Sequence, residues 1–152
     1  MPTGRQPGGS HSVRMRIVRL TPGDEALLDI AARQFRGVEG VDQSSFLRDP
    51  ATVVLLMMND ADVVGWAWGL RQRHVCGYTQ LQLYELAVAE PMRRRGVGRE
   101  LVGAFLEIAR TEGHEKVWLI TTEDNIAAKN LYQAMGGGPA GHDKAGYWWN
   151  LA

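Results

Sequence analysis

The stretch LYELAVAEPMRRRGVGREL, residues 83–101, carries the strongest structural signal in this sequence. Its first residues continue a strand that we expect to begin at Gln80 and to end near Val88. Two glycines, Gly96 and Gly98, then precede an amphipathic helix whose apolar residues recur at helical spacing. Such a turn exposes backbone N–H groups at the positive end of the helix. The sequence therefore predicts a site for an anion such as a pyrophosphate at this turn.

Four arginines surround the two glycines and add positive charge that the bare backbone lacks: Arg93, Arg94, Arg95 and Arg99. The glycines alone fit equally well a tight turn between a strand and a helix, with the arginines on a solvated face. The G-x-G-x-x-G motif of dinucleotide-binding folds fails, because position 101 is Leu. A P-loop fails as well, because no Gly-Lys-Ser/Thr occurs.

Apolar patterns and turn residues elsewhere predict a mixed α/β chain. Strand 80–88, helix 97–112 and a buried strand 117–121 would form a βαβ unit with parallel strands. Thr21-Pro22 is expected to cap and begin the first helix. The other expected elements are a strand in 12–20, a helix ending at about Phe35, a short helix from Ser44 or Ser45, hairpin strands 51–58 and 63–70, helix 125–135 and a final strand 146–151.

Composition narrows the class of protein. A chain of 152 residues with 45% hydrophobic residues is expected to form one domain over 12–152, with 1–11 as a disordered leader. Lys and Arg balance Asp and Glu at 17 each, which argues against nucleic acid or a membrane surface as the partner. Cys76 is the only cysteine, so we expect no disulfide, no zinc site and a reducing, cytoplasmic compartment.

Two spaced motifs add to this pattern: Arg93-x-x-Gly96-x-Gly98 after the strand end Leu86-Ala87-Val88, and Asn125-x-x-Ala128-x-x-Leu131-Tyr132-x-x-x-Gly136. In this order they resemble the acetyl-CoA signature and the second cofactor motif of the GNAT acyltransferase superfamily. The resemblance implies an acetyl-CoA-dependent N-acetyltransferase, with homodimers common among relatives. It also implies a mixed α/β fold, with a mostly antiparallel central sheet of about six to seven strands and about four flanking helices.

The resemblance assigns roles around the cofactor. Strands of this family diverge there, so the backbone near Val88 would pair with the pantetheine arm and polarise the thioester carbonyl. The family's tyrosine falls on Tyr132, as general acid toward the leaving thiolate. Asn125 would bind the pantetheine, although capping its own helix explains it equally well. The cofactor-binding residues implied are Leu86, Ala87, Val88, Arg93, Arg94, Arg95, Gly96, Val97, Gly98, Arg99, Asn125, Ala128 and Tyr132.

The residue that receives the amine is less defined, because the family uses no single fixed base. Glu85 lies one residue before Leu86, beside the point where the strands should part. We expect it to act as general base or as amine anchor; the alternative is a solvated surface charge, with Tyr84 on the opposite face of the strand. Glu123 and Asp124 are further candidate anchors for the substrate amine.

Residues 83–101 and the hairpin ending VVGWAW also resemble the aminoglycoside 3-N-acetyltransferases of this superfamily, whereas the C-terminal GHDKAGYWWN departs from them. A polycationic aminosugar would suit a site rich in carboxylates, although each one also fits an ordinary surface. The candidates are Glu39, Asp42, Asp49, Glu85, Glu123, Asp124 and Asp143.

Two other hypotheses remain open from the sequence. In the first, the chain acetylates an amine of a peptide or protein, or another small amine. In the second, the chain is a non-catalytic acyl-CoA-binding regulatory module on the same fold. An intact Tyr132 and a complete glycine turn favour catalysis. The tryptophans at 66, 68, 118, 148 and 149 fit an aromatic wall for a sugar, although packing on the sheet explains most of them.

Overall fold

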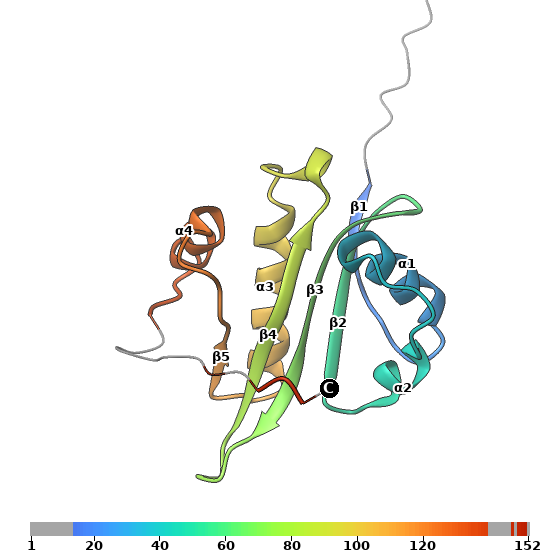
Figure 1. Ribbon diagram of the computed structural model, residues 1–152. Helices are drawn as coiled ribbons and strands as arrows, with labels where there is room; N and C mark the ends of the chain where they lie inside the picture. The colour runs from blue at the N-terminus through green and yellow to red at the C-terminus, as the bar shows by residue number, and fades with distance from the viewer. Residues whose placement is uncertain (1–13, 140–146, 148, 152) are drawn as a thin grey trace, which may run out of the picture.

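The computed structural model describes residues 14–139, 147 and 149–151. Its centre is a five-stranded sheet in the order β1-β2-β3-β4-β5 (Figure 1). Neighbouring strands are antiparallel except β4 and β5, which are parallel and are connected through a helix. The strands are β1 (Met15–Arg19), β2 (Thr52–Asn59), β3 (Asp62–Arg73), β4 (Thr79–Val88) and β5 (Lys116–Trp118).

Helices cover both faces of this sheet (Figure 1). One face packs against α1 and α2 through a cluster that includes Leu28, Leu56 and Trp66. The opposite face packs against α3 through a second cluster around Phe105, and α4 joins it through Leu131. The helices are α1 (Glu25–Arg36), α2 (Gln43–Arg48), α3 (Val97–Thr111) and α4 (Ile126–Ala134), with a short 3₁₀ turn η1 (Glu90–Met92).

The predicted mixed α/β fold and its parallel βαβ unit are confirmed, with fewer strands than expected among the described residues. The strand predicted at 117–121 is short and only half-buried, because β5 pairs with β4 over three residues and then separates from it. Of the strand predicted at 146–151, the described residues 147 and 149–151 are not in a strand, while Gly146 and Trp148 lie outside the described residues. The predicted leader 1–11 also lies outside them.

The first helix begins later than Thr21-Pro22 predicts. Its N-cap is Asp24, and Gly23 precedes it with a φ of 110°, so the proline belongs to a turn before the helix. The Thr21 backbone N–H and hydroxyl both donate to the Asp24 carboxylate, at 2.8 and 3.3 Å. The local sequence was therefore correct about a helix start and wrong about its residue.

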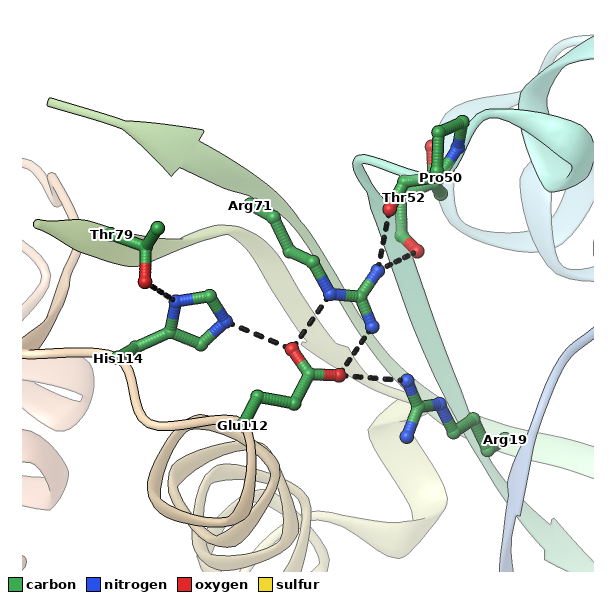
Figure 2. A network of polar contacts seen from close by, with 7 residues as sticks. All are labelled: Arg19, Pro50, Thr52, Arg71, Thr79, Glu112 and His114. Carbon is green, nitrogen blue, oxygen red and sulfur yellow. Dashed lines mark hydrogen bonds and ion pairs between the residues drawn. The ribbon is translucent and has the colours of Figure 1, made fainter.

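A polar network at the end of α3 joins that helix to the sheet (Figure 2). Arg71 of β3 donates two hydrogen bonds to the Glu112 carboxylate, at 2.6 and 2.7 Å, and Arg19 of β1 donates a third at 3.2 Å. The His114 ring lies between Glu112 at 2.8 Å and the Thr79 hydroxyl at 2.9 Å. Hydrogen bonds from Arg71, and to a smaller degree from His114 and Arg19, lower the pKa of Glu112 to about 2.

We expect Glu112→Gln to lower the free energy of unfolding by about 2 kcal/mol at pH 7, because charge-assisted hydrogen bonds are lost. A depressed pKa stabilises the fold above the usual value of 4.5. The difference between wild type and variant should therefore shrink as the pH falls from 4.5 toward 2. Urea unfolding at several pH values measures both effects.

Glu107→Gln is the matched control for this change. Glu107 lies on α3, and its ion-pair partner among the described residues is Arg110, at 3.4 Å; 70% of the Glu107 side chain is exposed. Its loss should cost less than about 0.5 kcal/mol. Equal losses in the two variants, or a Glu112 effect that persists at pH 2, would contradict this account of the network.

Candidate active site

A cleft opens where β4 and β5 separate. The two strands pair only between Gln80–Gln82 and Lys116–Trp118, so the rest of β4 has no strand partner on this side among the described residues. The cleft has a volume of about 260 Å³. Its lining comes from β4, from the chain after β5 and from parts of α1, β3 and α4, namely Phe35, Arg36, Trp66, residues 83–87, residues 119–121, Asn125 and Tyr132.

The open edge of β4 presents backbone groups to this cleft. The Ala89 N–H donates to the Val64 carbonyl at 2.9 Å, which fixes the direction of the strand's alternating backbone groups. Val88 therefore directs its N–H and C=O away from β3. The Arg93 side chain donates its Nε–H to this Val88 carbonyl at 3.2 Å. The Val88 N–H points to the same side of the strand, next to the cleft residue Ala87.

The loop after β4 places the N-terminus of α3 beside the end of that strand. Arg94 and Gly96 take left-handed backbone angles, with φ of 62° and 80°, and α3 begins at Val97. An added Cβ at Gly98 would lie 3.3 Å from Leu131 of α4 and 3.8 Å from Val88. Gly98 thus permits close packing of α3 against α4 and β4, a different reason from the ligand approach that the sequence suggests.

The first turn of α3 has unused hydrogen-bond donors. The first hydrogen bond of the helix runs from the Glu100 N–H to the Gly96 carbonyl at 3.0 Å, so the N–H groups of Val97, Gly98 and Arg99 have no acceptor within the helix. No side chain caps this end. Four exposed arginines form no ion pair with any described residue: Arg93, Arg94, Arg95 and Arg99. This combination fits a diphosphate.

Tyr132 projects from α4 into the cleft and also packs against the core cluster of α3. Burial raises the pKa of the Tyr132 phenol above its usual value of 10, so the group stays protonated at neutral pH. Asn125 lines the same cleft and caps α4, because its Oδ1 accepts a hydrogen bond from the Ala128 N–H at 3.2 Å. The capping explanation for Asn125 therefore holds, and its side-chain NH₂ group is not used by the cap.

Glu85 of β4 lines the same cleft as Tyr132, and two partners hold its carboxylate. The Trp68 indole N–H donates to Oε2 at 3.3 Å, and an Arg36 guanidinium nitrogen lies 3.6 Å from Oε1. The expectation that Tyr84 faces away from Glu85 is wrong. A β-bulge leaves Tyr84 unpaired with β3, and its ring stacks on Trp68 with a centroid distance of 4.7 Å.

Residues 24–137 match the family described as the acetyltransferase (GNAT) family. The chain belongs to this family.

The matches to sequence relatives cover only part of this chain, and they cover a still smaller fraction of each relative's own length. The rat protein N-acetyltransferase 8B is 34% identical over 93 residues, which are 60% of this chain and 42% of that protein. The chain thus spans less than half the length of this relative. The match therefore does not establish the substrate of this chain.

Solved structures share the GNAT fold at low sequence identity. An aminoglycoside acetyltransferase from an uncultured soil metagenomic sample, in complex with trehalose, has a TM-score of 0.79 and 18% identity, covering 91% of this chain and 96% of its own. An aminoglycoside N-acetyltransferase in complex with CoA has a TM-score of 0.74 and 16% identity, covering 93% and 98%. At these identities the likeness establishes the fold alone.

Of the other acidic candidates, those among the described residues do not line the GNAT cleft. Glu123 pairs with Lys129 at 2.9 Å and is 97% exposed, while Asp124 contributes a backbone carbonyl to the turn before α4. Asp42 caps α2 through Ser45, which lowers the pKa of Asp42. Asp143 lies outside the described residues, and Glu39 and Asp49 have local partners, Arg33 and Ala51 respectively.

Sequence reasoning missed Arg36, Phe35 and the chain after β5 as cleft residues. Arg36 is 49 positions from Glu85 along the chain, and no local pattern indicates that α1 ends at that carboxylate. Trp66 also lines the cleft, and its buried indole N–H has no partner among the described residues. A tryptophan in an apolar strand predicts burial but gives no sign of which cavity it borders.

Two further features of the described residues concern other kinds of site. No group of three or more His, Cys, Asp or Glu side chains there is arranged to hold a metal ion. None of the helices in that part of the chain has the length and apolar character needed to cross a membrane.

Proposed function

We propose that this GNAT chain transfers the acetyl group of acetyl-CoA to a primary amine. The observation that carries the proposal is the cleft between β4 and β5, which brings together an unpaired strand edge, a half-buried phenol and a carboxylate. The first turn of α3 packs against the end of this strand edge through Gly98 and Val88. The proposed anion donors would therefore lie at the end of the same strand that lines the cleft.

Binding of the cofactor would use the backbone first. The N–H groups of residues 97–99 would hold the diphosphate, with charge added by the exposed arginines at 93–95 and 99. The open edge at Leu86, Ala87 and Val88 would pair with the pantetheine arm, as an added strand does. Ala128 donates its N–H to Asn125 on the first turn of α4, the helix that brings Tyr132 to the cleft.

When bound, acetyl-CoA supplies an activated acetyl group as a thioester. The Val88 N–H would donate a hydrogen bond at the open edge, where negative charge develops. Tyr132 would donate its proton to the leaving CoA thiolate. This role suits a phenol whose pKa is raised by burial, because the group is then protonated. Glu85 would anchor the incoming ammonium or take its proton, since it is the carboxylate among the described cleft residues.

For the amine, we propose a small polycationic substrate, an aminoglycoside acetylated at its 3-N position. Support comes from the likeness of residues 83–101 to that subfamily and from a carboxylate beside an aromatic cluster at the cleft. Trp66, Trp68 and Tyr84 form this cluster with Phe35. Such rings suit the apolar faces of a sugar. The proposal also takes the reducing cytoplasm as the place of action and a homodimer as the assembly.

A second candidate substrate is another small amine or a peptide amine. The specific observation in its favour is that the rat N-acetyltransferase 8B is 34% identical over its match, whereas the aminoglycoside acetyltransferase structures are 16–18% identical. Sequence likeness thus favours relatives that are not named for aminoglycosides.

The experiment measures release of CoA thiol from acetyl-CoA with a panel of aminoglycosides, polyamines, amino acids and peptides. Mass spectrometry of the products then gives the acetylated nitrogen. Turnover of an aminoglycoside at its 3-N position supports the full proposal. Turnover of other amines alone would reject the aminoglycoside substrate and keep the reaction, and no turnover with measurable CoA binding would favour a regulatory module.

We expect Glu85→Gln to raise KM for the amine, and to lower kcat at saturating acetyl-CoA about tenfold or more if the same carboxylate also takes the proton. The KM for acetyl-CoA should stay within about twofold of wild type. Glu107→Gln, an exposed carboxylate on α3, is the charge control. Normal amine kinetics in Glu85→Gln would assign the role to another group.

A further inference from the structure

Arg36 and Glu85 meet at the wall of the cleft, and both line it. Arg36 is the last residue of α1, and the chain turns away at Gly37, which caps the helix in a left-handed conformation with φ of 65°. The helix end thus brings a guanidinium to within 3.6 Å of the Glu85 carboxylate. This distance is an ion pair without a short hydrogen bond, which limits its strength.

The two partners are not held equally. Glu85 has 22% of its side chain exposed, accepts the Trp68 indole N–H and lies on a strand beside a β-bulge. Tyr84 stacks on the same Trp68 ring and restrains it. Arg36 has 62% of its side chain exposed, and among the described residues its ion-pair partner is Glu85. The carboxylate is therefore fixed in place, while the guanidinium can be replaced at low cost.

We propose that Arg36 is a specificity-determining residue that occupies Glu85 in the free protein and competes with the substrate ammonium for this carboxylate. The inference rests on the proposed function, in which Glu85 receives the amine. An arriving ammonium must displace the guanidinium and then lies near its charge. Each further positive charge on the substrate is repelled as well, so the penalty on binding rises with substrate charge.

The test compares Arg36→Gln with Arg36→Lys, using kanamycin A as a polycation and phenethylamine as a monocation. Arg36→Gln should lower KM for kanamycin A roughly two- to fivefold, the range that an exposed ion pair allows. The decrease for phenethylamine should be smaller, and the change in kcat smaller than that in KM. Arg36→Lys keeps the charge and should return KM toward the wild-type value.

Arg33→Gln is the matched control, since it removes the same charge from the last turn of α1. Arg33 is 58% exposed and pairs with Asp29 and Glu39 at 3.6 and 3.0 Å, without contacting Glu85. Its KM values should match wild type. In the Glu85→Gln background, Arg36→Gln should no longer lower KM, because the contested carboxylate is absent.

Binding of both amines, measured by calorimetry in parallel, distinguishes a failure of the proposed acetyl transfer from a failure of the proposed competition at Glu85. No thiol release from any amine, with kanamycin A still bound more tightly by Arg36→Gln, would reject the proposed acetyl transfer and support competition at Glu85. An unchanged or raised KM and Kd in Arg36→Gln would overturn the inference. Equal decreases in Arg33→Gln would overturn it too, because they would reflect net charge alone.

Discussion

Tyr132→Phe should lower kcat roughly 100-fold while the Kd for CoA changes less than about twofold. A positioned general acid contributes on the order of 100-fold or more to a proton transfer, and phenylalanine removes only the donating hydroxyl. The ring itself remains in the cleft and keeps its packing against the core of α3. Steady-state kinetics and calorimetric CoA binding measure the two quantities.

The pH profile adds a test that packing does not affect. Burial raises the pKa of Tyr132 above 10, and an acid works only in its protonated form. On the alkaline side, the wild-type rate should therefore fall only when the pH rises above 10, and Tyr132→Phe should lack this decline. Tyr78→Phe, in the turn between β3 and β4, is the control with normal rates. Identical pH profiles for wild type and Tyr132→Phe would remove the acid role.

Gly96→Asp should weaken CoA binding at least about tenfold. Gly96 caps α3 with φ of 80°, a conformation that Asp adopts more readily than most residues. The Asp carboxylate would accept hydrogen bonds from the free N–H groups of the first turn of α3. Its negative charge would also repel a diphosphate bound at those N–H groups. A change of 1.4 kcal/mol in binding corresponds to tenfold in Kd. Calorimetry with CoA gives the affinity, and circular dichroism verifies the fold.

Gly96→Asn is the matched control, because it has nearly the same shape and backbone preference without the charge. An added Cβ at position 96 meets no atom within 4 Å, so neither variant clashes with described residues. The Asn variant should lose about threefold in affinity or less. Equal affinity of Gly96→Asp and wild type would count against the diphosphate site, and equal loss in both variants would assign the effect to backbone strain.

The sequence was most informative where signals are local. Strand 80–88, the glycine turn and helix 97–112 are read from short-range periodicity, and the structure has them within a residue or two. The N-terminal turn of α3 follows directly from this order of elements. The elements that would carry the proposed site at β4 could thus be predicted before any tertiary contact was known.

Long-range features could not be predicted in the same way. The bulge at Tyr84 depends on how β4 pairs with β3. Side chains normally alternate between the two faces of a strand, and the bulge interrupts this alternation, so Tyr84 lies on the same face as Glu85. The Arg36 and Glu85 contact depends on where α1 ends against the sheet. The short β5 depends on the separation of two parallel strands, which no pattern within residues 117–121 reveals.

A crystal structure with bound CoA is the most direct test of the central claim. The account predicts diphosphate oxygens within about 3.2 Å of backbone nitrogens among residues 97–99, with the pantetheine arm beside residues 86–88. A diphosphate bound elsewhere, with those N–H groups facing solvent, would contradict it.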